Sequence, residues 1–243
     1  MKIDKLFKSV FKKNQYKSNT KRLDTTALEK YSPNLIKIMN LLIYTKKSNV
    51  SYSGGEFNTG YHTFEIDGHQ FKGQRNPKMR LEDIPLCFDN LSVLDIGCNQ
   101  GGMLYELSNK IKSGVGIDYD SRMINVANKM KSHSKLNNLD YYVFDLENEN
   151  LDYISDFLPD EKVDVVFLLS ICMWIKNWKE VINLIPLISS KLIFESNGSK
   201  EQQIEQINHL KLSYKIVQLI KEKSTDDPSQ KNRQLYYCTN DES

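Results

Sequence analysis

The feature that most constrains this chain is an apolar run that ends in a cluster of small residues. Residues 93–96 have the composition of a buried strand, and residues 97–102 include three glycines before a helix-forming run. Glycine lets the backbone pass close to a ligand, and open α/β sheets bind ligands at the carboxyl ends of their strands. The sequence therefore predicts a strand, a tight turn and a helix that border a ligand crevice.

A second expected strand ends in an acid. Residues 115–117 lead into Asp118, about 20 residues after the first turn, where a carboxylate can accept hydrogen bonds from both hydroxyls of a ribose. Gly97 and Gly101 do not have the Gly-x-Gly-x-x-Gly spacing of dinucleotide enzymes. A nicotinamide-dependent enzyme, or a domain in which these glycines only form a turn, is therefore the less favoured alternative.

Strand-like and helix-like runs alternate from residue 91 onward, which is typical of an α/β fold with a parallel sheet. Strands are expected at residues 92–96, 114–117, 141–144, 163–169, 191–195, 214–219 and 234–238, and helices at residues 102–110, 121–131, 151–157, 178–188 and 200–210. A long polar loop without a helix signal separates the last two strands. We therefore expect these two strands to form an antiparallel pair.

The chain divides by composition into three predicted parts: a basic helical extension over residues 1–48, a hairpin or lid region over 49–90, and a ligand-binding domain over 91–243. Residues 1–22 are rich in Lys, contain Asp4 as their one acid, and carry apolar residues at helical spacing. This amphipathic helix is expected to dock on its own protein; the alternative is peripheral attachment to an anionic membrane face. A second helix is expected at residues 35–44, and Asp67-Gly68 after an alternating run predicts a hairpin.

Composition excludes several other classes of protein. The net charge of +2, from 33 basic and 31 acidic residues, is too balanced to indicate a polyanionic partner by itself. The four cysteines are far apart, so no metal site is expected. The apolar runs are too short to span a membrane, and the N-terminus lacks the pattern of a secretory signal. The predicted location is cytoplasmic, at the inner membrane face if the basic helix binds lipid.

These motifs resemble the class I S-adenosylmethionine-dependent methyltransferases, with residues 94–101 similar to the first motif and residues 116–118 to the second. The resemblance covers about residues 91–238. It implies a Rossmann-like, doubly wound α/β fold whose seven-stranded sheet has an antiparallel last strand, and S-adenosylmethionine as the cofactor. It also assigns roles around that first turn: Gly97, Cys98, Asn99 and Gly101 surround the methionine portion, Asp95 orients the loop, and Asp118 holds the ribose. Asn99 departs from the family, which commonly has glycine there, but Asn tolerates unusual backbone angles.

Residues after the later strands complete the site that the resemblance implies. Asp145, with Leu146 beside it, is expected to bind the adenine amino group, and Tyr119 to lie against the adenine ring. Ser170 and Trp174 belong to the fourth of these strands and to the loop after it, which in the family faces both cofactor and acceptor. Ser170 is therefore a candidate cofactor ligand, and Trp174 a candidate acceptor contact.

The segment upstream of the domain loosely resembles methyltransferases related to the transfer RNA wobble-uridine enzymes, whose relatives include enzymes of surface-glycan pathways. Gln74, Arg75 and Arg80 are expected to contact the carboxylate end of the cofactor or an anionic acceptor, since Arg binds carboxylates with two hydrogen bonds. Ordinary salt bridges are the alternative for either arginine. Tyr61 is a candidate acceptor contact.

The predicted reaction is an in-line displacement at a sulfonium, so a dedicated base is not required. If the acceptor is a hydroxyl, His62 and Glu195 are the candidate bases, and a purely structural role is the alternative for His62. The chain lacks an Asn-Pro-Pro-Tyr segment after the fourth strand, which disfavours nitrogen acceptors. The predicted function is O-methylation of a small-molecule or glycan-linked acceptor. Two alternatives stay open: a transfer RNA-modifying methyltransferase, which would bind RNA, and a catalytically silent S-adenosylmethionine-binding protein.

Overall fold

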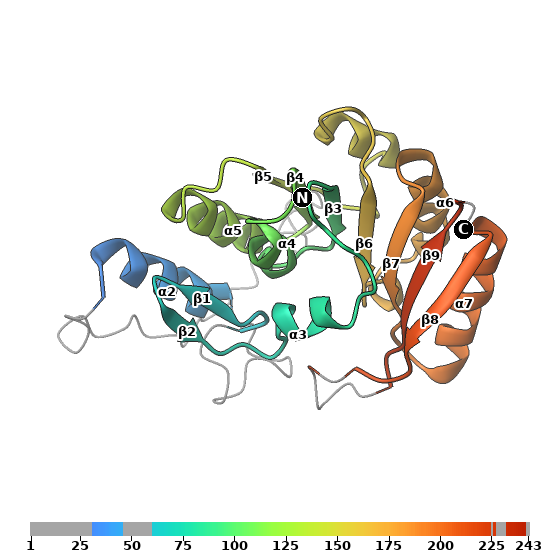
Figure 1. The fold of residues 1–243 in the computed structure, drawn as a ribbon, viewed down its shortest axis with the longest axis horizontal. Helices are drawn as coiled ribbons and strands as arrows, with labels where there is room; N and C mark the ends of the chain where they lie inside the picture. Colours follow the sequence, from blue (N-terminus) through green and yellow to red (C-terminus); the bar gives the residue numbers. More distant parts are fainter. Residues whose placement is uncertain (1–30, 46–59, 225, 227–231, 242–243) are drawn as a thin grey trace, which may run out of the picture.

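The computed structural model describes residues 31–45, 60–224, 226 and 232–241 (Figure 1). The basic helix expected within residues 1–22 lies outside the described residues. In the described part of the chain, every helix is too short or too polar to cross a membrane.

A seven-stranded mixed sheet forms the centre of the molecule, in the order β5-β4-β3-β6-β7-β9-β8 (Figure 1). The strands are β3 (Ser92–Ile96), β4 (Ser113–Asp118), β5 (Leu139–Val143), β6 (Val165–Leu169), β7 (Lys191–Glu195), β8 (Ile216–Lys221) and β9 (Leu235–Thr239). Neighbours from β5 to β7 pair in parallel, whereas β9 is antiparallel to both β7 and β8. This confirms the predicted Rossmann-like sheet with an antiparallel last strand. The strand order reverses between β3 and β6, which is the point where such sheets bind ligands.

Helices cover both faces of this sheet because side chains alternate along each strand. Leu94 and Ile96 of β3 contribute to the core beneath α6 (Trp178–Ile188) and α7 (Lys200–Ser213). Val93 points to the opposite core, which includes apolar residues of α4 (Gly102–Leu107) and α5 (Ser121–His133). The crevice is thus set between two packed layers.

Two expected helices differ from the structure in detail. Residues 151–157 form a 3-10 helix, η3 (Leu151–Phe157), and α4 ends at Leu107 instead of continuing to residue 110. The Lys110 carbonyl accepts a hydrogen bond from the Asn90 N–H, which draws this stretch out of the helix. The short 3-10 helix η4 (Cys172–Trp174) and helix α3 (Pro77–Glu82) had no sequence prediction.

The segments upstream of the sheet pack onto it. Helix α2 (Pro33–Thr45) lies against α5, and the hairpin of β1 (Phe64–Ile66) and β2 (His69–Phe71) shares its apolar core (Figure 1). Asp67 and Gly68 have φ values of 52° and 72°, as the predicted two-residue hairpin turn requires. The hairpin prediction is confirmed, and its apolar side is buried.

Candidate functional site

The turn after β3, residues 97–101, which we call the glycine turn, is held in a left-handed conformation. Gly97, Asn99 and Gly101 have φ values of 76°, 52° and 74°. A Cβ atom on Gly97 would lie 2.7 Å from Ile171 Cγ2, and one on Gly101 would lie 2.6 Å from Tyr141 Cε1. Glycine is therefore required at both positions, whereas Asn99 adopts the same φ region, as this residue type tolerates.

Asp118, at the end of β4, is joined directly to the glycine turn. Its Oδ2 accepts a hydrogen bond from the Asn99 N–H at 2.9 Å, and its Oδ1 accepts one from the Asp120 N–H at 2.9 Å. The two motifs predicted from the sequence are thus brought together. A carboxylate offers about four acceptor sites, so holding the turn is compatible with the predicted bond to a ribose.

Asp95, next to the last residue of β3, is buried close to the glycine turn. Burial raises the pKa of Asp95 to about 7; the positive charge of Arg80 opposes this shift, and the negative charge of Asp118 adds to it. Two acids that lie this close favour a cationic ligand, since such a ligand would relieve their repulsion.

Cys98 turns its side chain away from solvent. Its sulfur would lie 2.9 Å from a Cβ atom on Gly116, so the thiol packs on β4, and burial raises its pKa well above the usual value. We infer that Cys98 contributes its backbone, and not a reactive thiolate, to the crevice.

The predicted adenine ligands follow the ends of β4 and β5. Asp145 lies in a turn in which its carboxylate accepts from the Asn148 side chain at 2.8 Å and the Glu147 N–H at 3.0 Å; these bonds lower its pKa. The preceding residue, Phe144, donates its N–H to the Asp118 carbonyl, so this turn is next to the end of β4. Tyr119 is 64% exposed, whereas Leu146 is buried.

Side chains from four distant segments meet in a buried ion cluster, which we call the arginine cluster: Arg75, Arg80, Ser170, Glu195 and Asp226. Arg75 Nη2 donates to Glu195 Oε1 at 2.8 Å and its Nε to Asp226 Oδ2 at 2.6 Å, while Arg80 Nη2 donates to Glu195 Oε2 at 3.0 Å. The Ser170 hydroxyl also donates to Glu195 Oε2. Burial alone would raise the pKa of Glu195, but Arg80 and Arg75 outweigh it and hold that pKa below its usual value.

A third arginine, Arg233, lies at the edge of the arginine cluster. Arg233 Nη1 lies 4.0 Å from Glu195 Oε2, so three guanidinium groups surround the carboxylates of Glu195 and Asp226. Arg75 is fully buried, and its Nη1 has no hydrogen-bond partner among the described residues. This arrangement suits an additional anionic group.

His62 is fixed at the start of α4. Its Nδ1 accepts a hydrogen bond from the Gly102 N–H at 3.3 Å, and a Cβ atom on Gly102 would lie 2.5 Å from its ring. Burial, with smaller contributions from Arg80 and Arg75, lowers its pKa well below the usual value, so the ring is neutral. This geometry favours the structural alternative for His62, while a role as a base stays a prediction.

The other predicted upstream residues are placed by a short pairing of two segments. The Arg75 N–H donates to the Tyr61 carbonyl at 2.7 Å, and the Gln74 N–H to the Gly60 carbonyl at 3.0 Å. The Tyr61 and His62 rings lie 4.7 Å apart. Tyr61, His62, Gln74 and Arg75 therefore form one strip beside the glycine turn, to which the His62 N–H is bonded through Gln100.

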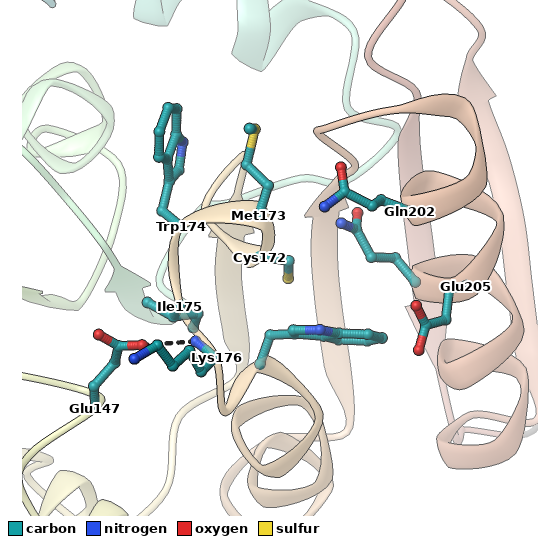
Figure 2. A pocket seen from close by; sticks show the side chains of 10 residues that line it. Glu147, Cys172, Met173, Trp174, Ile175, Lys176, Gln202 and Glu205 are labelled. Carbon is teal, nitrogen blue, oxygen red and sulfur yellow. Dashed lines mark hydrogen bonds between the residues drawn. The ribbon is translucent and has the colours of Figure 1, made fainter.

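A cavity of about 410 Å³ opens beside the segment that follows β6 (Figure 2). Its walls include Cys172, Met173, Trp174 and Trp178 on one side, and Gln202 and Glu205 of α7 on the other. Trp174, a predicted acceptor contact, is 69% exposed. No group of three or more His, Cys, Asp or Glu side chains suited to a metal occurs among the residues that the structure describes.

Three residues of the site had no prediction from the sequence. Gln100 Oε1 accepts from the His62 N–H, Asn197 Nδ2 donates to the Ser170 carbonyl, and Asp226 binds Arg75. Gln100 and Asn197 each follow an expected strand by a few residues, which is the only sequence signal that pointed to them. Asp226 lies in the polar loop between the last two strands, where no spacing pattern marks it.

The sequence matches known proteins over parts of its length. Residues 88–238 match the sequence profile of the family described as Methyltransferase domain. Protein 235L of Invertebrate iridescent virus 6, which is named as a methyltransferase, is 36% identical over 90 residues, 36% of this chain and 29% of that protein. The U6 snRNA methylphosphate capping enzyme Amus of Drosophila melanogaster is 45% identical over 53 residues, 21% of this chain and 18% of that enzyme.

Two solved structures have a similar fold. The bifunctional kinase-methyltransferase WbdD aligns with a TM-score of 0.60 and 21% identity, over 83% of this chain and 47% of WbdD. The N-terminal domain of EvdMO1, solved in the presence of SAH and D-fucose, aligns with a TM-score of 0.58 and 10% identity, over 86% of this chain and 99% of that domain.

At these identities the structural likeness shows the fold alone, and the matches span less than half the length of 235L, Amus and WbdD. The family match, in contrast, covers more than half of this chain. It agrees with the sheet order, the glycine turn and the acid at the end of β4. The chain therefore belongs to the class I S-adenosylmethionine-dependent methyltransferases, with a Methyltransferase domain over residues 88–238 and S-adenosylmethionine as its cofactor.

Proposed function

We propose that this chain is an enzyme that transfers a methyl group from S-adenosylmethionine to an oxygen atom of a small-molecule or glycan-linked acceptor. The observation that carries the proposal is the arrangement at the ends of β3 and β4, where Asp118 is bonded to the glycine turn and its charge acts on the buried Asp95. Two acids fit a ligand that carries a sulfonium and an ammonium group, and the nearby arginines fit its carboxylate. The cofactor supplies a methyl group that is already activated.

The roles predicted for individual residues become part of this proposal. Asp118 accepts from the ribose hydroxyls, Asp145 accepts from the adenine amino group, and Tyr119 covers the adenine ring. The backbone of the glycine turn lies along the methionine portion. Arg75 Nη1, buried without a hydrogen-bond partner among the described residues, is available to a carboxylate of the cofactor or of the acceptor.

Two observations support an oxygen acceptor. Methyltransferases that act on nitrogen resemble one another in an Asn-Pro-Pro-Tyr segment after the fourth strand. This chain has Ser170 and the residues after it in that place. The EvdMO1 domain, similar in fold, was solved in the presence of a sugar, D-fucose, and of the demethylated cofactor SAH. A sugar hydroxyl is an oxygen nucleophile of this kind.

Orientation and electrostatics supply most of the catalysis in this proposal. Glu195 is ionised, but Arg75 and Arg80 hold its carboxylate, and His62 is neutral with its Nδ1 bonded to Gly102. His62 accepts a proton at Nδ1 only by giving up its bond from the Gly102 N–H, and the charges of Arg80 and Arg75 make the Glu195 carboxylate a weak base. We therefore assign the larger effect to alignment of the acceptor oxygen with the methyl group, which an in-line displacement demands.

A phosphate oxygen on RNA is the second candidate acceptor. The likeness to Amus, whose name describes methylphosphate capping of U6 snRNA, favours it, and the three guanidinium groups near Glu195 are suited to a phosphate. An RNA substrate would also require a continuous stripe of Lys and Arg beside the crevice and binding that weakens steeply with salt.

The test has two parts. Calorimetry measures the binding of S-adenosylmethionine, and a labelled-methyl assay then offers the protein extract fractions separated into RNA, protein, glycan and small-molecule pools. We expect label in the glycan or small-molecule pool. Label in the RNA pool would favour the second candidate, and cofactor binding without label in any pool would instead support the catalytically silent alternative.

A further inference from the structure

Both tryptophans of the chain line one cavity. The sequence contains two, Trp174 and Trp178, and each contributes to the wall of the opening of about 410 Å³ beside η4. This volume is within the range of roughly 300–1,000 Å³ that is usual for small-molecule sites. Trp174 is 69% exposed although it is the largest kind of apolar side chain, so a large ring surface is available to a ligand.

The Trp178 ring is held in place. The edge of the His209 ring meets it with centroids 5.4 Å apart, and Lys179 Nζ lies 5.2 Å from its centroid. A ring that is fixed before the ligand arrives loses little conformational entropy on binding, which favours a stacking role.

The wall that carries Trp174 is equally rigid. Asn197 Oδ1 accepts from the Met173 N–H at 3.0 Å and its Nδ2 donates to the Ser170 carbonyl at 2.5 Å. Gln206 in turn bonds both backbone groups of Asn197, at 3.2 and 2.9 Å. The wall is therefore built from β7, α7 and η4 together.

This wall is continuous with the cofactor crevice. Ile171, the residue before η4, packs so closely on the glycine turn that a Cβ atom on Gly97 would clash with it. Ser170, the residue before Ile171, is bonded to Glu195 of the arginine cluster. The wall of the cavity is thus joined through Ile171 and Ser170 to the glycine turn and to the arginine cluster.

The polar groups around the rings select the class of ligand. Figure 2 shows Gln202 and Glu205 projecting from α7 on one side of the cavity, with Glu147 at the other end. Amide and carboxylate groups bind hydroxyls well, and flat aromatic rings offer apolar surface to the C–H face of a sugar. The acids Glu147 and Glu205 are balanced by Lys176 and by Lys179, which pairs with Glu205 at 2.6 Å, so the wall has no surplus of positive charge for the phosphates of a nucleic acid.

We propose that the cavity between η4 and α7 is a sugar subsite for the acceptor, in which Trp178 stacks on the sugar ring, Trp174 lines the η4 side, and Gln202 and Glu205 bind the sugar hydroxyls. This inference rests on the proposed function, because it names the part of the acceptor that the same enzyme would hold while an oxygen of that acceptor is methylated.

The two tryptophans make the test direct, because all tryptophan emission from this protein comes from the cavity wall. We expect D-fucose, D-mannose or D-galactose to change this emission saturably in the full-length protein loaded with S-adenosylhomocysteine. Trp174→Phe and Trp178→Phe, each with one emitter left, show which ring responds. Trp174→Ala and Glu205→Gln should each weaken sugar affinity about tenfold.

Tyr153→Ala is the matched control, since Tyr153 is an exposed aromatic residue, 58% accessible, outside the cavity. It should leave sugar affinity unchanged. A lack of saturable response to all three sugars, or a response to uridine monophosphate alone, overturns the subsite. Calorimetry of S-adenosylmethionine with the same variants separates the two proposals: intact cofactor binding with no sugar response refutes the subsite, while no cofactor binding in the wild-type protein refutes the proposed function.

Discussion

At the scale of single residues, Asp118 is the group to which we assign the largest part in cofactor binding. Replacing it by Ala removes the proposed ribose acceptor and the bond to the Asn99 N–H. Hydrogen bonds to charged groups contribute about 1.5–3 kcal/mol, so affinity for S-adenosylmethionine should fall about 10- to 100-fold in calorimetry. Asp140→Ala, at an exposed acid on the neighbouring strand β5, is the control and should bind normally. An Asp118→Ala protein with wild-type affinity would refute the assignment.

Asp95 makes stability depend on pH. Its pKa, raised to about 7 by burial, exceeds the ordinary value of 3.8, so the folded protein holds this proton more tightly than the unfolded chain does. The contribution of Asp95 to the free energy of unfolding therefore falls as the pH rises from its ordinary pKa of 3.8 to about 7. Without cofactor, Asp95→Asn should raise the Tm more at about pH 8 than at about pH 5. A Tm difference that stays constant with pH would count against the raised pKa.

Local spacing explains which residues the sequence could predict. Gly97 and Asp118 each follow directly on an apolar strand, so their neighbours in the chain reveal their place in the fold. The partner of Arg75, in contrast, is 151 positions away at Asp226. Neither periodicity nor a motif connects these two residues, and only the folded sheet brings them together.

At the scale of elements, the arginine cluster joins α3 and the segment before it, the ends of β6 and β7, and the β8–β9 connection. Glu195→Gln would leave two buried guanidinium groups with Asp226 as the remaining acid of the cluster. Removing one partner of a buried ion pair costs about 3–5 kcal/mol, so urea denaturation should show a large loss of stability. Asp140→Asn breaks an exposed pair with Lys131 and should cost less than about 1 kcal/mol. Equal losses in the two variants would contradict the importance of the cluster.

The strands of the sheet were predicted better than its connections. All seven expected strands form. The five parallel strands were the easiest to predict, because strands buried on both faces read as continuous apolar runs. η4 was not predicted, since three residues provide no helical period, and η3 took a 3-10 form that shares the composition of an α-helix. The division at residues 48 and 90 stays a prediction.

At the scale of the whole molecule, the basic segment at the start of the chain is predicted to dock on the protein itself, and attachment to an anionic membrane is the alternative that a deletion tests. Deleting residues 1–17 removes many Lys residues, each of which contributes about 1 kcal/mol near an anionic surface. We expect weaker binding to vesicles that contain anionic lipid in a sedimentation assay, with unchanged cofactor affinity. Equal sedimentation of both proteins would rule out membrane attachment through this segment.

Gln100 connects parts of the chain that composition alone would separate. Its Oε1 accepts from the His62 N–H at 2.9 Å, and its Nε2 donates to Thr45 Oγ1 at 2.5 Å, although Gln100 itself belongs to the glycine turn. A ligand that tightens this turn must also steady the end of α2 and the strip at His62. Binding of a ligand at the glycine turn should therefore slow amide hydrogen exchange at Thr45, 55 positions upstream. A protein shortened to residues 91–243 would lose these hydrogen bonds and with them part of the support of the turn.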